Sequence, residues 1–301
     1  MTELGIAACS RLLGPPLRLL SCIRFDEVRL LQGATLIGAT FSIGAFTLQN
    51  LMVVAAAVTG NICLVAHVFV LNDWSGIESD LKDPTRASWT FIAKGVSRTE
   101  IGYLALGLLA IGLAIFWLIG AAPFLVAVAI AALSALYSMP SFNIKGVPLY
   151  SSALHLLGGA LHFLLGYLTL RSIDGRGIAV SCFFGLVFSA GHLTHQARDL
   201  EGDSLNGIRT TAVAFGKVQC FFGSLALFSA AYALLAALAA SGSVPFVLMF
   251  AVALYPFHLY AAWRALRGGL TYEALRRLQA SYRGIFALIG IAMLVTVPFS
   301  Q

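Results

Sequence analysis

The sequence predicts an all-α protein that crosses a membrane several times. Of its 301 residues, 59% are hydrophobic and only 11% are charged, and the mean hydropathy is +0.88. A soluble domain averages about 25% charged residues. Nine apolar runs follow one another along the chain, each close to the roughly 20 residues with which a helix spans a bilayer. The basic residues gather in alternate segments between these runs.

The apolar runs divide the chain into an N-terminal arm, residues 1–28, and one transmembrane domain, residues 29–301. In the arm, Pro15 and Pro16 are expected to interrupt any helix, with a short amphipathic helix at the membrane surface around residues 17–25. Pro256 is expected to kink the eighth run. The runs lie at about 29–48, 51–71, 101–119, 122–138, 148–170, 177–197, 218–240, 244–263 and 283–299.

The basic residues predict the orientation of these helices. With nine spans and the N-terminus inside, all 19 Lys and Arg residues except Arg171 and Arg176 fall in segments on the cytoplasmic side. We therefore expect an integral multi-pass membrane protein whose N-terminus and two acidic segments face the cytoplasm. The five cysteines are scattered, so neither a zinc site nor a disulfide framework is indicated.

The segment after the sixth run carries the clearest chemical signal. Asp199 and Asp203 are four residues apart, which places them on one face of a helix. Two such carboxylates suit Mg²⁺, which keeps several waters and bridges to the phosphates of a substrate. Arg198 and Arg209 flank the pair, and arginine suits phosphate oxygens. The alternative interpretation is a solvated loop in which the carboxylates only cap helices.

A second acidic segment follows the second run. Asn72 and Asp80 are eight residues apart and share a broad helical face, with Asp73 and Glu78 close by. Two acidic clusters, each at the end of an apolar helix, could together hold two metal ions and one diphosphate. Their spacing also indicates a weak internal repeat, in which runs 1–4 and 5–8 face each other across a central cavity and run 9 packs outside. Such repeats occur in transporters too.

Histidines mark two of the apolar runs. His192, His195 and Asp199 follow each other on one helical face, which we expect to line the cavity. His195 could orient Asp199 or act as a base, or it could be a hydrogen-bonded packing residue. His155 and His162 lie beside Gly158 and Gly159, where cavity lining and close helix packing are both open.

At these residues the chain resembles the UbiA-type intramembrane prenyltransferases. That family carries Asn-Asp-x-x-Asp-x-x-x-Asp after its second helix and Asp-x-x-x-Asp after its sixth. Here Asp199-Leu-Glu-Gly-Asp203 is followed by Gly207, Arg209-Thr210-Thr211 and Gly216, as in the family pattern. Leu136-Tyr137-Ser138-Met139-Pro140, followed by Lys145, is similar to the family's segment between its fourth and fifth helices. The resemblance covers most of the chain and implies a UbiA-type fold.

The first motif departs from the family pattern. Gly76 stands where the central Asp is expected, while Asn72, Asp73 and Asp80 match. Three outcomes are open. Asp73 or Glu78 takes its place through a local change of helix geometry, a water fills the position, or the activity is lost or changed. Downstream, Arg86 is not followed by the Pro that the family often has.

The resemblance implies Mg²⁺-dependent transfer of an isoprenoid chain from a prenyl diphosphate to a small acceptor, usually aromatic, within the lipid bilayer. No nucleic-acid partner is expected. Two rival functions stay open, a prenyl diphosphate cyclase or lyase on the same scaffold, and a non-catalytic prenyl-lipid-binding protein or transporter. The implied metal ligands are Asn72, Asp80, Asp199 and Asp203, the catalytic residues Asp73, Asp199 and Tyr137, and the substrate-binding residues Arg86, Lys94, Lys145, Arg198, Arg209 and His195.

Overall fold

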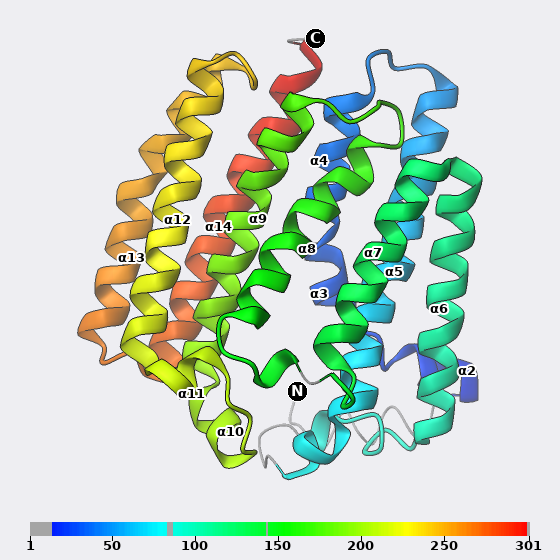
Figure 1. Ribbon diagram of the computed structural model, residues 1–301, viewed down its shortest axis with the longest axis vertical. Coiled ribbons are helices and arrows are strands. Elements are labelled where there is room, and N and C mark those ends of the chain that lie inside the picture. Colours follow the sequence, from blue (N-terminus) through cyan, green and yellow to red (C-terminus); the bar gives the residue numbers. More distant parts are fainter. Residues whose placement is uncertain (1–13, 83–86, 143, 300–301) are drawn as a thin grey trace. The chain divides into compact units, whose positions relative to one another are not determined.

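The computed structural model describes residues 14–82, 87–142 and 144–299, and every regular element in these ranges is a helix (Figure 1). The predicted all-α fold is therefore confirmed. The chain divides into two compact units. The first unit contains Met1–Gln32 and Ala56–Asn143, and the second contains Gly33–Ala55 and Ile144–Gln301.

Seven helical stretches in the described residues are long and apolar enough to cross a membrane. The expected count of nine is not confirmed, because the helices at the first and fifth expected spans fall outside this group. Helix α4, Gln32–Ser42, has 11 residues, or about 16 Å, against a hydrocarbon layer of about 30 Å. Helix α8, Tyr150–Tyr167, carries two histidines that reduce its hydropathy. The seven stretches are α5 (Leu48–Lys82), α6 (Arg98–Ile119), α7 (Ala121–Ser138), α9 (Gly175–Arg198), α12 (Lys217–Ala240), Phe246–Arg267 and α14 (Tyr272–Thr296).

The N-terminal arm forms two short helices in place of the single amphipathic helix expected around residues 17–25. Helix α2, Pro15–Leu20, begins at its prolines, which suit the first turn because the amide that proline lacks has no helical partner there. Helix α3, Phe25–Leu30, follows after a break, with Arg24 at its N-cap position. Cys22, Ile23 and Val28 are buried in the core of the first unit. The arm is thus part of this packed unit.

The start of α6 is fixed by a capping box beside the arm. The Ser97 hydroxyl accepts a hydrogen bond from the Glu100 amide at 3.2 Å, and the Glu100 carboxylate accepts one from the Ser97 amide at 2.8 Å. Gly95, two residues earlier, has a φ of 76°, which glycine adopts without strain. The chain can therefore turn sharply between Lys94 and α6, after the short 3₁₀ helix η1, Ala87–Trp89.

In the second unit, α4 packs against α8 through direct backbone contact. A Cβ built on Gly38 would clash with the carbonyl oxygen of Phe163, and one built on Gly166 would clash with that of Thr35. The Thr35 hydroxyl donates to the His162 carbonyl at 2.8 Å. Residues 33–55 therefore belong with the second unit, and not with the following three spans as the internal repeat suggested.

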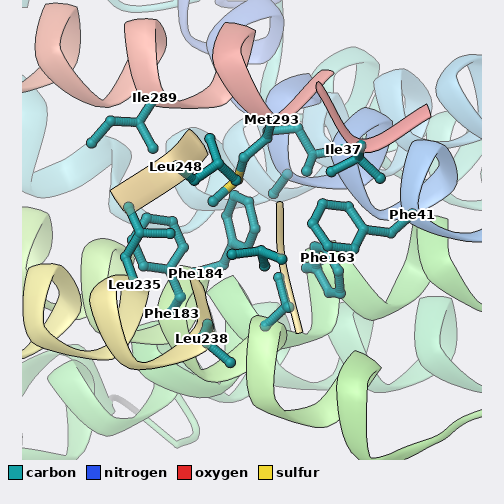
Figure 2. Packing of buried hydrophobic residues seen from close by; sticks show 14 of the residues in the cluster. Ile37, Phe41, Phe163, Phe183, Phe184, Leu235, Leu238, Leu248, Ile289 and Met293 are labelled. Carbon is teal, nitrogen blue, oxygen red and sulfur yellow. The ribbon is translucent and has the colours of Figure 1, made fainter. Parts of the chain in front are cut away.

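Helices α8, α9 and α12 lie side by side in Figure 1. A Cβ on Gly159 would lie 2.7 Å from the Phe184 carbonyl oxygen, so the predicted close helix packing holds at this glycine. Figure 2 shows buried hydrophobic residues of the core to which these helices contribute. In this core Phe163 and Phe184 stack with ring centroids 5.1 Å apart. Phe41 of α4 meets Phe163 edge to face.

Asp174 caps the N-terminus of α9. Its carboxylate accepts hydrogen bonds from the Gly177 amide at 2.7 Å and from the Tyr167 hydroxyl at 2.9 Å, and Arg171 lies 3.4 Å away. The Gly177 N–H, followed by the Tyr167 hydroxyl, holds the pKa of Asp174 below its usual range. This cap joins the end of α8 to the start of α9.

The last two expected spans differ from the sequence prediction in their boundaries. The eighth is a 3₁₀ helix, η3 (Phe246–Leu254), that continues as α13 (Tyr255–Arg267), with Pro256 in the first turn of α13. The ninth was expected to begin at residue 283, but α14 begins at Tyr272, where Thr271 caps it by accepting from the Ala274 amide at 3.3 Å. The basic residues near the start of α14 lower the hydropathy there, so the apolar pattern did not indicate this part of the helix.

Candidate functional site

The first acidic motif occupies the last turns of α5, which runs without interruption to Lys82. Asn72, Asp73 and Asp80 are all half-buried. Gly76 lies one turn before Asp80, and a Cβ built on it meets only the Asp80 Oδ2 atom, at 3.8 Å. A Cβ at position 76 therefore meets no clash with the described residues.

Arg24 binds Asp73 at two points. Its Nε atom donates to Asp73 Oδ2 at 3.1 Å, and its Nη2 atom donates to Asp73 Oδ1. The Asp73 side chain is 18% exposed and that of Arg24 is 47% exposed. A guanidinium thus covers the one carboxylate that immediately follows Asn72, and it comes from the N-terminal arm, 49 residues away.

Three other charged residues near the first motif, Glu78, Lys94 and Arg98, also have partners. The Lys94 ammonium donates to the Ser21 carbonyl at 2.7 Å. Glu78 has an 81% exposed side chain and lies 3.6 Å from Arg98, whose guanidinium also covers the Trp74 ring at 5.0 Å. Glu78 therefore points away from the motif, which argues against its replacing the missing carboxylate.

The second acidic motif lies at the junction of α9 and the short helix α10, Leu200–Leu205. Asp199 is the C-cap residue of α9 and the N-cap residue of α10. The Asp203 amide donates to the Asp199 carbonyl at 2.9 Å, so the predicted helical spacing persists across the junction. Asp203 is buried, with 7% exposure, and the Asp199 side chain is 19% exposed.

Arg198 orients Asp199. Its Nε and Nη2 atoms donate to the two carboxylate oxygens of Asp199 at 2.7 and 2.9 Å. Its Nη1 atom donates to Gln279 Oε1 of α14 at 2.5 Å, and its guanidinium lies 5.7 Å from the centre of the Tyr272 ring. The sequence did not indicate Gln279, because its partner lies 81 residues away.

A segment after the motif connects it to the start of α8. The Thr211 hydroxyl, at the start of α11 (Thr211–Phe215), accepts a hydrogen bond from the Leu149 amide at 3.1 Å. Lys145 lies four residues before Leu149 in the 3₁₀ helix η2, Ile144–Gly146, and is half-buried. Arg209 is exposed. Two predicted phosphate-binding cations therefore flank this contact within the second unit.

Glu201 lies inside the second motif but turns toward Lys217, whose ammonium lies 2.6 Å from its carboxylate. Partial burial raises the pKa of Glu201, but the bond to Lys217 outweighs it and the net pKa is lowered. Glu201 therefore pairs with the first turn of α12, and its negative charge already has a partner in Lys217.

The histidine stripe on α9 divides between two environments. Ser189 donates to the Ser152 carbonyl at 3.0 Å, and the His192 ring stacks on that of His155, so both residues meet α8. His195 Nε2 is buried and has no hydrogen-bond partner in the described residues. His192 and His195 thus differ in their surroundings, although they lie on one face of α9.

The predicted site residues are thus distributed over both units. The first unit holds Asn72, Asp73, Asp80, Lys94 and Tyr137, and Tyr137 is half-buried in the last turn of α7. The second unit holds Lys145, His195, Arg198, Asp199, Asp203 and Arg209. Arg86 lies outside the described residues. Across the parts of the chain that the structure describes, no group of three or more His, Cys, Asp or Glu side chains is gathered for a metal ion.

Comparison with known proteins gives one family match. Residues 33–278 match the sequence model of the UbiA prenyltransferase family. Among curated proteins, no sequence match was found.

Solved structures share this fold. A UbiA homologue from Archaeoglobus fulgidus bound to DMAPP and Mg²⁺ superposes with a TM-score of 0.71 at 16% identity, covering 92% of this chain and 99% of that one. An apo UbiA homologue from Aeropyrum pernix K1 gives a TM-score of 0.73 at 19% identity over 90% and 98% of the two chains. A structure of digeranylgeranylglyceryl phosphate synthase gives 0.71 at 18% identity over 94% and 98%.

Proposed function

Since the chain belongs to the UbiA prenyltransferase family, we propose that it transfers an isoprenoid chain from a prenyl diphosphate to a small, aromatic acceptor within the membrane. The observation that carries this proposal is the intact second motif. Asp199 and Asp203 keep the helical spacing that two ligands of one cation need, and Arg198 holds the Asp199 carboxylate in a fixed orientation.

The residues fit a magnesium ion in their chemistry. Carboxylate and amide oxygens are the ligands that Mg²⁺ prefers, and it usually takes only one or two carboxylates from the protein, with waters and substrate phosphates completing the shell. A pair such as Asp199 and Asp203 is therefore a sufficient donor set. In the first motif, Asn72 and Asp80 supply the corresponding oxygens, and a bound Mg²⁺ would neutralise negative charge on the leaving diphosphate.

The basic side chains have a separate task. The bond between the first carbon of the isoprenoid and the diphosphate oxygen breaks, and its electron pair stays on the diphosphate, where negative charge develops. We assign stabilisation of this charge to Lys94, Lys145, Arg198 and Arg209, together with Arg86. Lys94 would exchange the Ser21 carbonyl for a phosphate oxygen, and Arg198 would share its guanidinium between Asp199 and the phosphate.

The acceptor then attacks the allylic cation, a new bond forms to the isoprenoid carbon, and the acceptor loses a proton. We propose that the carboxylate of Asp73 or of Asp199 takes up this proton. Tyr137 is proposed to stabilise the cation or orient the donor. His195 is proposed to bind substrate. We place the N-terminus and both acidic motifs on the cytoplasmic side, where a soluble diphosphate is available.

The test is diphosphate release by the purified, detergent-solubilised protein. Geranyl, farnesyl and geranylgeranyl diphosphates are supplied with Mg²⁺ or EDTA, with and without a panel of aromatic acceptors. We expect release that requires Mg²⁺ and acceptor and that Asp199→Ala abolishes. Ser204→Ala is the matched control, since Ser204 is exposed on the same short helix.

Two rival functions make different predictions in the same experiment. Mg²⁺-dependent release without any acceptor requirement would identify a cyclase or lyase, in which the cation is captured internally. Gly76 is the observation that favours a non-catalytic prenyl-lipid-binding protein, because it removes a carboxylate from the first motif. Binding of the diphosphates without release from any of them would establish that function and overturn the proposal.

A further inference from the structure

A cluster of polar side chains is buried between α8 and α9, and neither acidic motif includes it. We call it the imidazole–amide cluster, and it consists of Ser151 and His155 from α8 and His192 and Gln196 from α9. The Gln196 amide nitrogen lies 2.8 Å from the Ser151 hydroxyl and 2.9 Å from His192 Nε2. His155 Nδ1 lies 2.8 Å from the Ser151 carbonyl oxygen. Polar groups at this depth of a membrane protein are expensive and usually functional.

The hydrogen bonds of Gln196 leave one atom without a partner. Both N–H groups of its amide are used, one toward Ser151 and one toward His192. Its Oε1 atom is buried and has no hydrogen-bond partner in the described residues, and the whole side chain is only 4% exposed. A buried acceptor without a donor destabilises a fold, so such atoms call for an explanation.

The same helix shows what a purely structural polar contact looks like. The hydroxyls of Thr194 and Ser224 lie 2.7 Å apart between α9 and α12, and one of them donates to the other. Both also lie within hydrogen-bond distance of the Ala190 carbonyl oxygen, at 3.3 and 2.7 Å. We call Thr194 and Ser224 a closed pair, because both hydroxyl oxygens have hydrogen-bond partners. Gly159 already brings α8 and α9 into backbone contact, so helix packing does not require the imidazole–amide cluster.

The cluster also offers a flat surface. The rings of His155 and His192 stack with centroids 3.6 Å apart and an angle of 10° between their planes. Gly158 lies one turn beyond His155 on the same face, and a Cβ built on it meets no described atom within 4 Å. There is thus open space beside Gly158, one turn from His155. Planar aromatic rings favour stacking on an imidazole.

We propose that the imidazole–amide cluster is a binding subsite for the hydroxyl-bearing aromatic head of the acceptor, whose O–H donates to Gln196 Oε1. The inference rests on the proposed function for the identity of the ligand as the acceptor. Gln196 is in this view a specificity-determining residue.

The test measures binding without any reaction. Saturation-transfer NMR compares 4-hydroxybenzamide with 4-methoxybenzamide on the full-length protein in detergent without Mg²⁺ or diphosphate. Both probes are neutral, and in the second a methyl group replaces the hydroxyl hydrogen, so that its oxygen can accept but not donate. We expect the hydroxyl probe to bind about tenfold more tightly, the factor for one hydrogen bond to a buried acceptor. Gln196→Met should remove this preference, and Thr194→Val, which breaks the closed pair on the same helix, should retain it.

A second variant keeps the inference testable if Gln196→Met does not fold. His192→Phe keeps an aromatic ring on His155 but removes the acceptor that fixes the Gln196 amide, and it should shrink the preference for the hydroxyl probe. Equal binding of the two probes by the unaltered protein, no binding of either, or a preference that survives Gln196→Met overturns the inference. No diphosphate is present in this binding experiment, so its outcome does not depend on the release assay. The protein can bind the hydroxyl probe without releasing diphosphate, and it can release diphosphate without preferring the hydroxyl probe.

Discussion

Arg24 and Asp73 form a two-point ion pair that ties the N-terminal arm to the first acidic motif. If Asp73 takes the place of the missing central carboxylate, a metal ion bound there has to displace this guanidinium or share the carboxylate with it. In that case a single side chain couples the arm to metal binding. The pair is partly exposed, so its contribution is at most about 1 kcal/mol.

Arg24→Gln is accordingly expected to lower the Mg²⁺ concentration for half-maximal diphosphate release by about fivefold, the factor that corresponds to about 1 kcal/mol. The measurement is a Mg²⁺ titration of release. Arg29→Gln is the matched control, because Arg29 and Asp26 form an exposed ion pair on α3, the helix that Arg24 precedes. A higher Mg²⁺ requirement in Arg24→Gln would show that the guanidinium supports the loaded site.

Gly76→Asp restores a third oxygen-bearing side chain to the helical stripe of Asn72 and Asp80. A Cβ at position 76 meets only the Asp80 Oδ2 atom among the described residues, at 3.8 Å, so the first atom of the new side chain causes no clash. We expect a tighter Mg²⁺ requirement and faster release, because an added carboxylate strengthens a hard-cation site. Gly76→Ala is the control that separates the added carboxylate from the loss of a helical glycine. It removes glycine from a helix, which stabilises by about 1 kcal/mol, without adding a ligand. Equal Mg²⁺ titrations for the two variants would refute the prediction.

Gln279→Leu should loosen the orientation of Arg198 and hence of Asp199. The lost hydrogen bond to a charged donor predicts a fall in the rate of release of about tenfold. Gln279→Glu keeps an oxygen acceptor for Arg198, and its rate should stay within about threefold of the unaltered protein. Steady-state kinetics with a saturating donor provide the measurement. If the glutamate variant were as slow as the leucine variant, Gln279 would have only a packing role.

Asp174→Ala removes the cap of α9, and the expected loss is about 1 kcal/mol, or a Tm lower by about 2 °C near neutral pH. Because the pKa of Asp174 is lowered in the folded protein, its stabilisation is fully present above the ordinary aspartate pKa and disappears as the pH falls through the lowered value. The difference in Tm between the two proteins should therefore shrink in acid. Asp174→Asn keeps the cap and should remove this pH dependence.

Much of the fold could be predicted from the sequence because apolar runs of membrane length form helices almost without alternative. The expected runs at 101–119, 122–138 and 218–240 match α6, α7 and α12 within a few residues. The start of α14 could not be predicted in this way, since Arg276, Arg277 and Arg283 interrupt its hydropathy. The assignment of α4 to the second unit depends on glycine contacts with residues over 100 positions away.

In the candidate site, too, local spacing could be predicted from the sequence and long-range contacts could not. The spacing of Asp199 and Asp203 was readable because i and i+4 residues share a helical face whatever surrounds them. Arg24 and Gln279 were not readable, because each acts through a partner far along the chain and neither belongs to a local motif. Gln196 could have been noticed as a polar residue one turn after His192, but its unsatisfied oxygen emerges only from the full hydrogen-bond geometry.

The glycine contacts of α8 have a consequence for laboratory evolution of this protein. Gly166 and Gly159 hold α8 against α4 and α9 at backbone distance, so a single added methyl at either position forces two helices apart. Gly158, the immediate neighbour of Gly159, carries no such constraint. Libraries intended to reshape the space beside the imidazole–amide cluster should therefore vary position 158 freely and leave 159 and 166 untouched, so that selection acts on side-chain volume while the helix spacing stays fixed.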